Sequence, residues 1–294
     1  MNPCQQLSAP RAESVSRRES TNGFTLLELM IIIGSLAVLL IVLTPALARV
    51  KPNGLAIQCL NNTRQLARAW QLYAEDNNDR LVINLHGAAS IGGAGDSTYG
   101  ASWVSGWQDW TTSSDNTNVA LINNPRFARL APYLRQDTNV VKCPADKFVS
   151  AVQVARGFTR RVRSYSANLY VGAGNVEAGP GDPLYRHVTK MSDLRFPTPA
   201  QTFVFVDEHP DSINDPGFFP PHQTAWVDYP TTYHNGAAAF SFVDGHSEMH
   251  KWAASLRKLP VVELNSAIVV TASSGDADLH WASFHSPRSG TVSY

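Results

Sequence analysis

The chain has little charge and few cysteines. Charged residues make up 16% of its 294 residues, and 24 Lys and Arg balance 24 Asp and Glu. Because there is no net field to draw the chain onto nucleic acid, nucleic acid is not an expected partner. Three cysteines, Cys4, Cys59 and Cys143, are too few for a disulfide framework. The abundant Gly, Pro and aromatic residues favour a loop-rich β domain over a helical bundle.

Several signatures of catalysis are also missing. The sequence has no Gly-x-Ser-x-Gly elbow, no His-Glu-x-x-His, no P-loop and no paired zinc-finger cysteines. The sequence therefore predicts that the protein is not an enzyme. A membrane-tethered, metal-dependent hydrolase that uses histidines and aspartates is kept as an alternative.

The first 22 residues contain no apolar run, although they carry Arg17 and Arg18. They are therefore unlike an ordinary secretory signal peptide, whose apolar segment follows a short basic start. The apolar segment here begins at Phe24. A helix over residues 24–48 would be roughly 37 Å long, enough to cross a hydrocarbon core of about 30 Å. The basic residues before it predict a cytoplasmic N-terminus and an exported remainder.

Glu28 interrupts this apolar segment. An unpaired carboxylate is costly in lipid and usually marks a function. Cleavage between Gly23 and Phe24 would create an α-amino group near Glu28, on the same chain and on neighbouring copies. Pairing of these groups would reward assembly.

The segment from Gly23 to Glu28, GFTLLE, resembles the class III signal of type IV pilins and type II secretion pseudopilins, because it follows a basic leader and precedes an apolar helix. The resemblance implies that a prepilin peptidase cuts after Gly23 and methylates Phe24. It also implies that Glu28 acts in assembly and that Pro45 corresponds to the helix-bending proline of many members. A single-pass anchor that merely begins with these residues is the alternative.

The rest of the chain predicts an α+β fold, in which the long helix packs on a C-terminal antiparallel sheet. Apolar residues recur at helical spacing over residues 56–76, after an interruption at Pro52-Asn53-Gly54. The expected segments are a leader (1–23), a transmembrane assembly helix (24–48), an amphipathic extension with a bend or break near residues 45–54 (49–79), a β-rich head with long loops (80–272) and a weakly ordered tail (273–294), of which Trp281 and Phe284 could dock.

A second resemblance lies in the predicted head. His234, nine further residues and Asp244-Gly245 resemble the H-X9-DG signature of pilin-like proteins abundant in planctomycetes and verrucomicrobia. That group has a mostly unassigned role, so the resemblance implies architecture rather than chemistry. Its further blocks match residues 59–67, 143–146, 163–168 and 205–208, and the whole resemblance covers roughly residues 17–252. The strand candidates are residues 163–171, 202–206, 237–243, 246–252 and 267–271, with Asp244-Gly245 as a hairpin turn.

Several residue groups are candidates for a site. His234 and Asp244 either serve the hairpin alone or join a metal or partner site. Cys59 and Cys143 either form a disulfide, worth on the order of 4 kcal/mol for a loop of some 80 residues, or are two buried thiols. An acidic loop is either solvated or binds calcium, and five histidines would bind a transition metal if they converged. The acidic loop comprises Asp207, Glu208, Asp211, Asn214 and Asp215, and the histidines are His209, His222, His234, His246 and His250.

Two further clusters favour packing over binding. Trp103, Trp107 and Trp110 are expected in the core, with a sugar or partner surface as the alternative. The basic run from Arg160 to Arg163 is expected at a solvated strand end.

The sequence as a whole predicts a pseudopilin or minor pilin of a type II secretion or type IV pilus-like filament. Its expected partners are prepilin peptidase, other pilin-like subunits, the inner membrane and the assembly platform. The expected location is the inner membrane, crossed once, with the head on the periplasmic side. A surface binding module exported by the same route is a further alternative.

Overall fold

The computed structural model describes residues 24–91, 102–174, 185–221, 224–253, 256, 259–264, 269–273 and 275–288. Within helix α1, the backbone alone is described for residues 42–53. The chain divides into two compact units, Met1–Arg49 and Val50–Tyr294, and the second is called the head below. The predicted leader and Gly23 lie outside the described residues.

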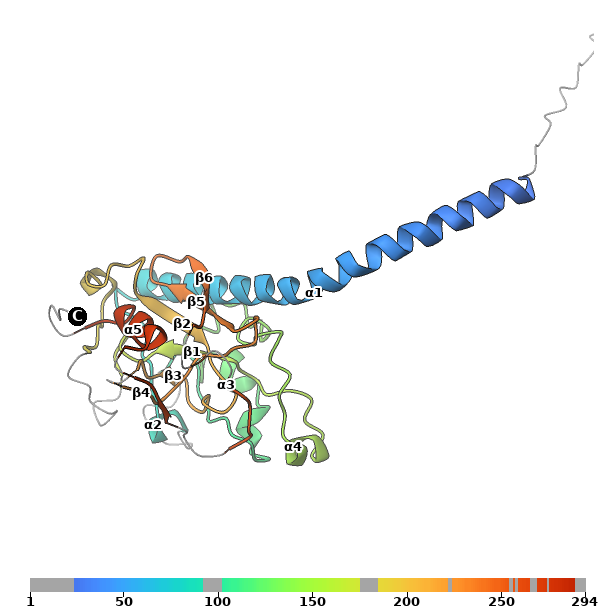
Figure 1. The fold of residues 1–294 in the computed structure, drawn as a ribbon. Coiled ribbons are helices and arrows are strands. Elements are labelled where there is room, and N and C mark those ends of the chain that lie inside the picture. The colour runs from blue at the N-terminus through green and yellow to red at the C-terminus, as the bar shows by residue number, and fades with distance from the viewer. Residues whose placement is uncertain are drawn as a thin grey trace, which may run out of the picture. The chain divides into compact units, whose positions relative to one another are not determined.

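Helix α1 runs without interruption from Leu26 to Asp76 (Figure 1). Of the bend or break expected near residues 45–54, the break is wrong, since the helix continues through Pro45 and Pro52, and the bend stays a prediction. An interior proline costs about 3 kcal/mol. Packing of the following turns in the head, from Cys59 onward, offsets that cost. Within the described part of the chain, no helix combines the length and the apolarity that a membrane crossing demands.

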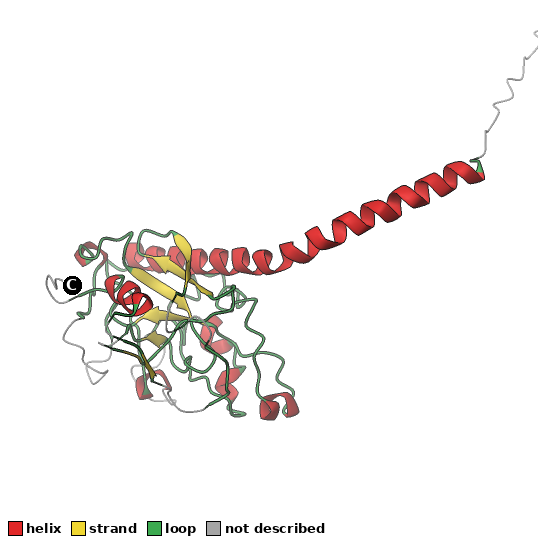
Figure 2. Cartoon of the chain, viewed as in Figure 1, coloured by secondary structure: helices red, strands yellow, loops and turns green. Residues whose placement is uncertain are grey.

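The head is built on a five-stranded sheet in the order β3-β1-β2-β5-β6 (Figure 2). Neighbouring strands are antiparallel, except that β1 and β3 are parallel. The mixed helix and sheet composition confirms the α+β class. The prediction of an antiparallel sheet is wrong for one pair of strands, β1 and β3. The strands are β1 (Tyr165–Asn168), β2 (Phe203–Asp207), β3 (Gly217–Phe218), β5 (Ala237–Phe242) and β6 (Ser247–Lys251), and β4 (Ala225–Trp226) pairs with β7 (Val270–Thr271) in a separate ribbon.

Strands β1, β2, β3 and β5 are buried on both faces of the sheet, whereas β6 is half-buried to exposed. Along β5, Ala238, Phe240 and Phe242 join one apolar cluster, while Ala239 joins the other, as the two-residue period of a strand requires. The cluster on the side of Ala239 contains Leu66 and Trp70 from α1. The second part of α1 is therefore an integral part of the head core.

The C-terminal segment corrects another expectation. Residues 273–294 were predicted to be weakly ordered, yet Ala277–Phe284 forms helix α5. Asp276 caps this helix by accepting hydrogen bonds from two backbone N–H groups, and Leu279 is buried in the second cluster. The remaining short helices are α2 (Ala88–Ile91), η1 (Ser114–Asn116), α3 (Ala120–Asn123), α4 (Ala151–Ala155) and η2 (Met191–Asp193).

Candidate functional site

Four potential metal ligands from four distant segments meet inside the head. Cys59 lies on α1, Cys143 in the loop between α3 and α4, Asp207 at the end of β2, and His234 in the turn before β5. Their ligand atoms all lie within 4.8 Å of one another. In the part of the chain that the structure describes, this is the one such group of three or more His, Cys, Asp or Glu side chains. We call these four residues the Cys-Asp-His cluster.

Short polar contacts hold the cluster together. Cys59 Sγ lies 3.2 Å from Asp207 Oδ2 and 3.1 Å from the Tyr165 hydroxyl. Cys143 Sγ lies 3.4 Å from His234 Nε2, which in turn lies 3.5 Å from Asp207 Oδ2. Both cysteines and Asp207 are completely buried. The cluster is therefore a closed, polar site inside an apolar core.

Burial and mutual contacts shift the protonation of these groups. Burial raises the pKa of Cys59 and of Asp207 well above their ordinary values. Burial would also raise the pKa of Cys143, but hydrogen bonds with Cys59 and His234, together with the charge of His234, bring it well below its usual range. Burial would lower the pKa of His234, whereas its hydrogen bonds with Asp207 and Cys143 raise it to about 9. The arrangement thus favours a thiolate at Cys143 facing an imidazolium at His234.

The two cysteines are free thiols in the structure. Of the two alternatives that the sequence left open, buried thiols are therefore the one the structure contains. The sequence had marked each member of the cluster separately, with the cysteines as a possible bridge, Asp207 in the acidic loop and His234 in the signature. No local spacing joins residues 59, 143, 207 and 234, which meet only through tertiary contacts among α1, the end of β2 and two loops.

The acidic loop does not form the predicted calcium site. Only Asp207 enters a group of potential ligands among the described residues, and its neighbours there are sulfur and nitrogen. Asp211 accepts hydrogen bonds from the backbone of Val262 and Leu264. Glu208 accepts one from Ser212. Asp215 accepts two from the backbone of Gly87 and Gly217, and Asn214 lies beside the pocket described below. The loop is tied into the fold by its own carboxylates.

The histidines do not converge either. His209 lies beside Asp211, and His246 pairs with Asp244 at 2.6 Å. His250 stacks on Trp281 with ring centroids 3.7 Å apart. His222 lies outside the described residues. Among the histidines described, His234 alone enters a group of potential metal ligands.

The hairpin explains the remaining part of the signature. Asp244 Oδ1 accepts hydrogen bonds from the backbone and ring of His246. Gly245 has a φ of +90°, and a Cβ there would lie 3.1 Å from Nε2 of Gln71 on α1. That same Nε2 donates to the carbonyl of Val243. The turn therefore requires glycine because it packs directly against the helix, and it confirms the predicted hairpin.

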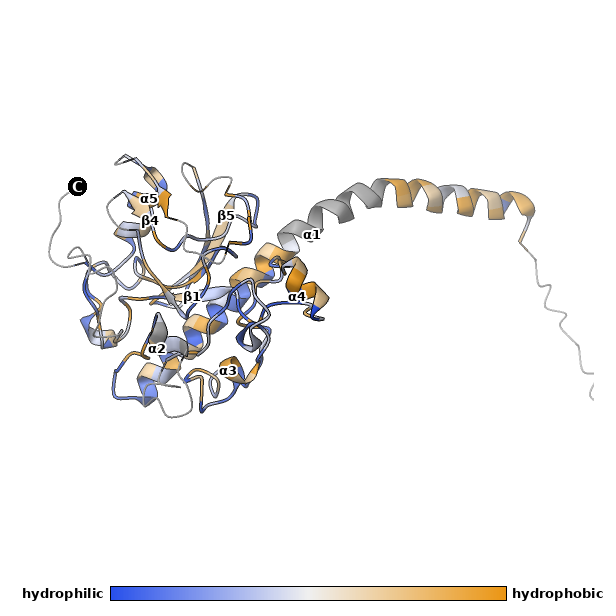
Figure 3. Ribbon diagram, turned by 90° about the horizontal axis from the view of Figure 1, so that it is seen from below, coloured by the Kyte–Doolittle hydropathy of each residue, from blue (hydrophilic) through white to orange (hydrophobic). Residues whose placement is uncertain are grey.

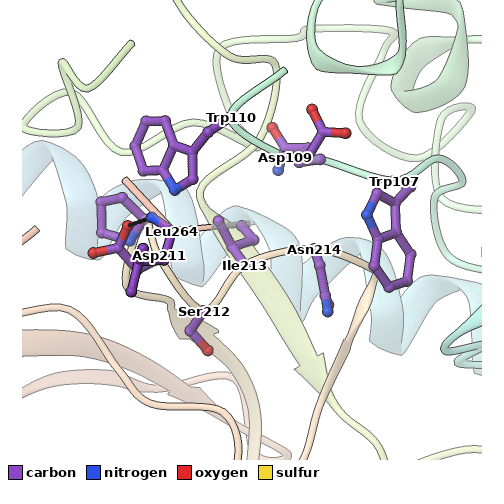
Figure 4. Close-up of a pocket in the computed structure, with 10 residues that line it drawn as sticks. Trp107, Asp109, Trp110, Asp211, Ser212, Ile213, Asn214 and Leu264 are labelled. Atoms are coloured by element: carbon purple, nitrogen blue, oxygen red, sulfur yellow. Dashed lines mark hydrogen bonds between the residues drawn. The ribbon is translucent and has the colours of Figure 1, made fainter. Parts of the chain in front are cut away.

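The tryptophans surround a small pocket rather than an open groove. Trp107 and Trp110 line a cavity of about 190 Å³ with Asp211 and Asn214 (Figure 4). Ligand pockets usually measure about 300–1,000 Å³, so this cavity is small for a sugar site. Trp103 and Trp110 are buried, as expected of core residues.

The basic run behaves differently from its prediction. Arg161 and Arg163 are both buried, although a solvated strand end was expected. The Arg161 guanidinium lies 4.1 Å from the ring centroid of Trp110. Arg163 donates to the carbonyls of Tyr165 and Asp215. Arg161 donates to the Pro210 carbonyl, so both buried arginines bond to backbone carbonyls.

The start of α1 gives Glu28 a local partner. Thr25 Oγ1 accepts a hydrogen bond from the Glu28 backbone, and the Glu28 carboxylate accepts bonds from Thr25 N and Oγ1, both at 2.9 Å. This reciprocal pattern is a capping box, which the sequence Thr-x-x-Glu signals. The sequence alone contains this motif, although Glu28 was interpreted there as an unpaired carboxylate.

No family model, no curated protein and no solved structure matches this chain.

Proposed function

We propose that the chain is a pilin-like structural subunit that assembles with further pilin-like subunits through the first part of α1, after cleavage between Gly23 and Phe24. The observation that supports this proposal is that the first part of α1 exposes a run of large apolar side chains. Thirteen large apolar side chains between Phe24 and Ile41 are exposed. The orange ribbon of this part of α1 in Figure 3 marks its hydrophobic residues.

The cost of leaving this surface in water is large. Burying one large aliphatic or aromatic side chain stabilises by about 1.5–3 kcal/mol. Covering half of the thirteen would therefore stabilise by on the order of 10 kcal/mol, which is comparable to the whole stability of a typical domain. Such a surface is stable only when it is buried. Neighbouring helices of the same type would bury it in the assembly, and the inner membrane would bury it before assembly.

Charge complementarity favours other pilin-like subunits as the occupant. Cleavage after Gly23 places a positive amine at Phe24, beside the Glu28 carboxylate of a neighbouring subunit. Glu28 already accepts hydrogen bonds from Thr25, which holds its carboxylate at the first turn of the helix. A charge-assisted hydrogen bond contributes about 1.5–3 kcal/mol, so this pair would select a matching register among many equivalent apolar contacts.

The head supports a structural role over the alternatives. Trp103 and Trp110 are buried, which disfavours a sugar-binding surface built on them. The Cys-Asp-His cluster is closed, whereas a hydrolytic metal site keeps one position open for water. Prepilin peptidase, an assembly platform and a periplasmic location of the head belong to the same proposal.

Mass analysis of the membrane-extracted protein tests the processing step. In cells with a working prepilin peptidase, we expect a mature chain that begins with N-methylated Phe24. An intact leader in those cells would contradict the proposal and would leave an ordinary anchored protein.

Substitutions at Glu28 test the assembly step. Glu28→Ala and Glu28→Gln should both be cleaved normally, yet each should reduce co-assembly about tenfold or more, because the charged partner of the amine is lost. The measurement is the amount of variant that copurifies with differently tagged wild-type subunits.

Two comparisons separate the charge from the helix cap. Glutamine retains an acceptor for Thr25, so normal assembly of Glu28→Gln would show that the cap, and not the charge, is what Glu28 provides. Thr25→Ala removes the threonine side chain from the capping box but keeps the carboxylate. It should therefore assemble nearly as well as the wild type.

A further inference from the structure

We propose that Cys59, Cys143, Asp207 and His234 bind one zinc ion, which fastens helix α1 to the sheet of the head. The proposal rests on the described contacts and is independent of the assembly role of the first part of α1.

The separations between the ligand atoms suit tetrahedral zinc. Zinc binds cysteine sulfur at about 2.3 Å and histidine nitrogen or carboxylate oxygen at about 2.0–2.2 Å. Tetrahedral angles then place a sulfur about 3.5 Å from a nitrogen or an oxygen, and the nitrogen about 3.4 Å from the oxygen. The corresponding distances are 3.4 Å for Cys143 to His234, 3.2 Å for Cys59 to Asp207 and 3.5 Å for His234 to Asp207. Small side-chain shifts would therefore admit the ion.

The ligand types narrow the choice of metal. Thiolates together with an imidazole favour zinc over calcium or magnesium, which prefer oxygen ligands. Four protein ligands without an open position are the mark of a structural rather than a catalytic zinc site. Burial of the two sulfurs and of Asp207 agrees with a closed site.

A carboxylate oxygen of the cluster lacks a hydrogen-bond partner among the described residues. Asp207 Oδ1 is buried and has no hydrogen-bond partner there, although Oδ2 contacts both Cys59 and His234. A buried polar atom without a partner costs about 1–3 kcal/mol. An ion beside the carboxylate would compensate for this cost by attracting both oxygens.

One neighbouring group lies in the outer shell of the cluster. The Tyr165 hydroxyl lies 3.1 Å from Cys59 Sγ and can donate to a metal-bound thiolate. Lys142 is also buried next to Cys143 in the chain, but its ammonium is paired with Asp146 and is therefore not a free counter-charge for the ion.

Metal analysis of the full-length protein in detergent tests the proposal. The protein is purified under reducing conditions, stripped with a chelator and dialysed against zinc or cobalt. We expect one zinc per chain after washing. With cobalt, we expect the visible bands of a tetrahedral site and the near-ultraviolet charge transfer of a thiolate ligand. Removal of zinc should lower Tm, and zinc, but not calcium, should restore it.

Matched variants locate the ion. Asp207→Asn, His234→Gln and Cys143→Ser should each weaken zinc binding by more than about a hundredfold, while Tyr165→Phe should have a smaller effect of about tenfold. His246→Gln alters a half-exposed histidine that pairs with Asp244 outside the cluster, and its zinc content should equal that of the wild type.

The wild-type measurement decides the matter even if a ligand variant fails to fold. Folded, reduced wild-type protein that binds neither zinc nor cobalt would overturn the proposal. So would a Cys59–Cys143 disulfide in the protein isolated from cells, because it would consume both sulfur ligands. Zinc content that falls equally in His246→Gln would place the ion elsewhere and would also overturn it.

Discussion

Replacing Asp146 by asparagine should lower the free energy of unfolding of the head by about 3–5 kcal/mol, because it leaves a buried ammonium without its counter-charge. Asp146 and Lys142 form a salt bridge in which both side chains are buried. The Lys142 ammonium donates to Asp146 Oδ2, which also accepts a hydrogen bond of 2.7 Å from Ser164 Oγ. Burial lowers the pKa of Lys142, and the charge and hydrogen bond of Asp146 oppose that shift.

Denaturant unfolding, followed by tryptophan fluorescence, measures the loss. A decrease of this size corresponds to a fall in Tm of about 10 °C for a domain of this length. The double variant Lys142→Met/Asp146→Asn should recover most of the lost stability, since a buried ion pair replaced by apolar groups is often neutral. If the double variant were as unstable as Asp146→Asn, the charge of Lys142 would not be the cause.

Trp70→Ala should destabilise the head by about 3–5 kcal/mol, because it opens a cavity in the cluster between α1 and the sheet. Trp70 is almost completely buried there, with Leu66 from the preceding turn of the helix. The same helix provides a control in Ile57, whose side chain is 59% exposed. Ile57→Ala should change the free energy of unfolding by less than about 0.5 kcal/mol.

Thermal unfolding followed by circular dichroism compares the two variants without relying on tryptophan emission. Equal losses in Trp70→Ala and Ile57→Ala would contradict the importance of packing on the sheet, because alanine favours the helix at both positions. A much larger loss in Trp70→Ala would establish the helix as part of the core.

The sequence predicted the parts of the fold that depend on local patterns. The alternation in β5 and β6 and the Asp244-Gly245 turn are visible within residues 237–251, and the structure confirms both. Helical spacing between residues 56 and 76 likewise predicted the second part of α1. In each case, the pattern that identifies the element lies within one element or one turn.

Other features depended on contacts that no local pattern reveals. Strand β3 has only two residues and exists because Pro216 and Phe218 carbonyls accept hydrogen bonds from β1 and the residue after it. Helix α5 follows a Ser- and Gly-rich stretch that resembles a disordered tail, and its order depends on Leu279 in the core. The sequence around Arg161 predicts a surface cation. In the structure, its guanidinium lies over Trp110 and donates to the Pro210 carbonyl.

The candidate metal site was missed for a related reason. Zinc sites are usually recognised by pairs of ligands that lie close together in sequence. Here each ligand comes from a different segment. The two that are nearest in sequence, Asp207 and His234, are separated by the whole segment between β2 and β5. The sequence shows which cysteines, histidines and aspartates the head contains. It does not indicate which four of them lie together in the fold.

The small residues of β5 have a mechanical consequence. Ala237, Ala239 and Ser241 share one face of this strand, opposite Phe240 and Phe242, and Ala239 lies in the cluster that contains Trp70. With so little side-chain volume on this face, backbone geometry largely sets the spacing between helix and strand. An interface filled by leucines can yield by changing rotamers, but alanines have none to change. A force applied along the second part of α1 would therefore be transmitted to the sheet with little relative displacement of helix and strand.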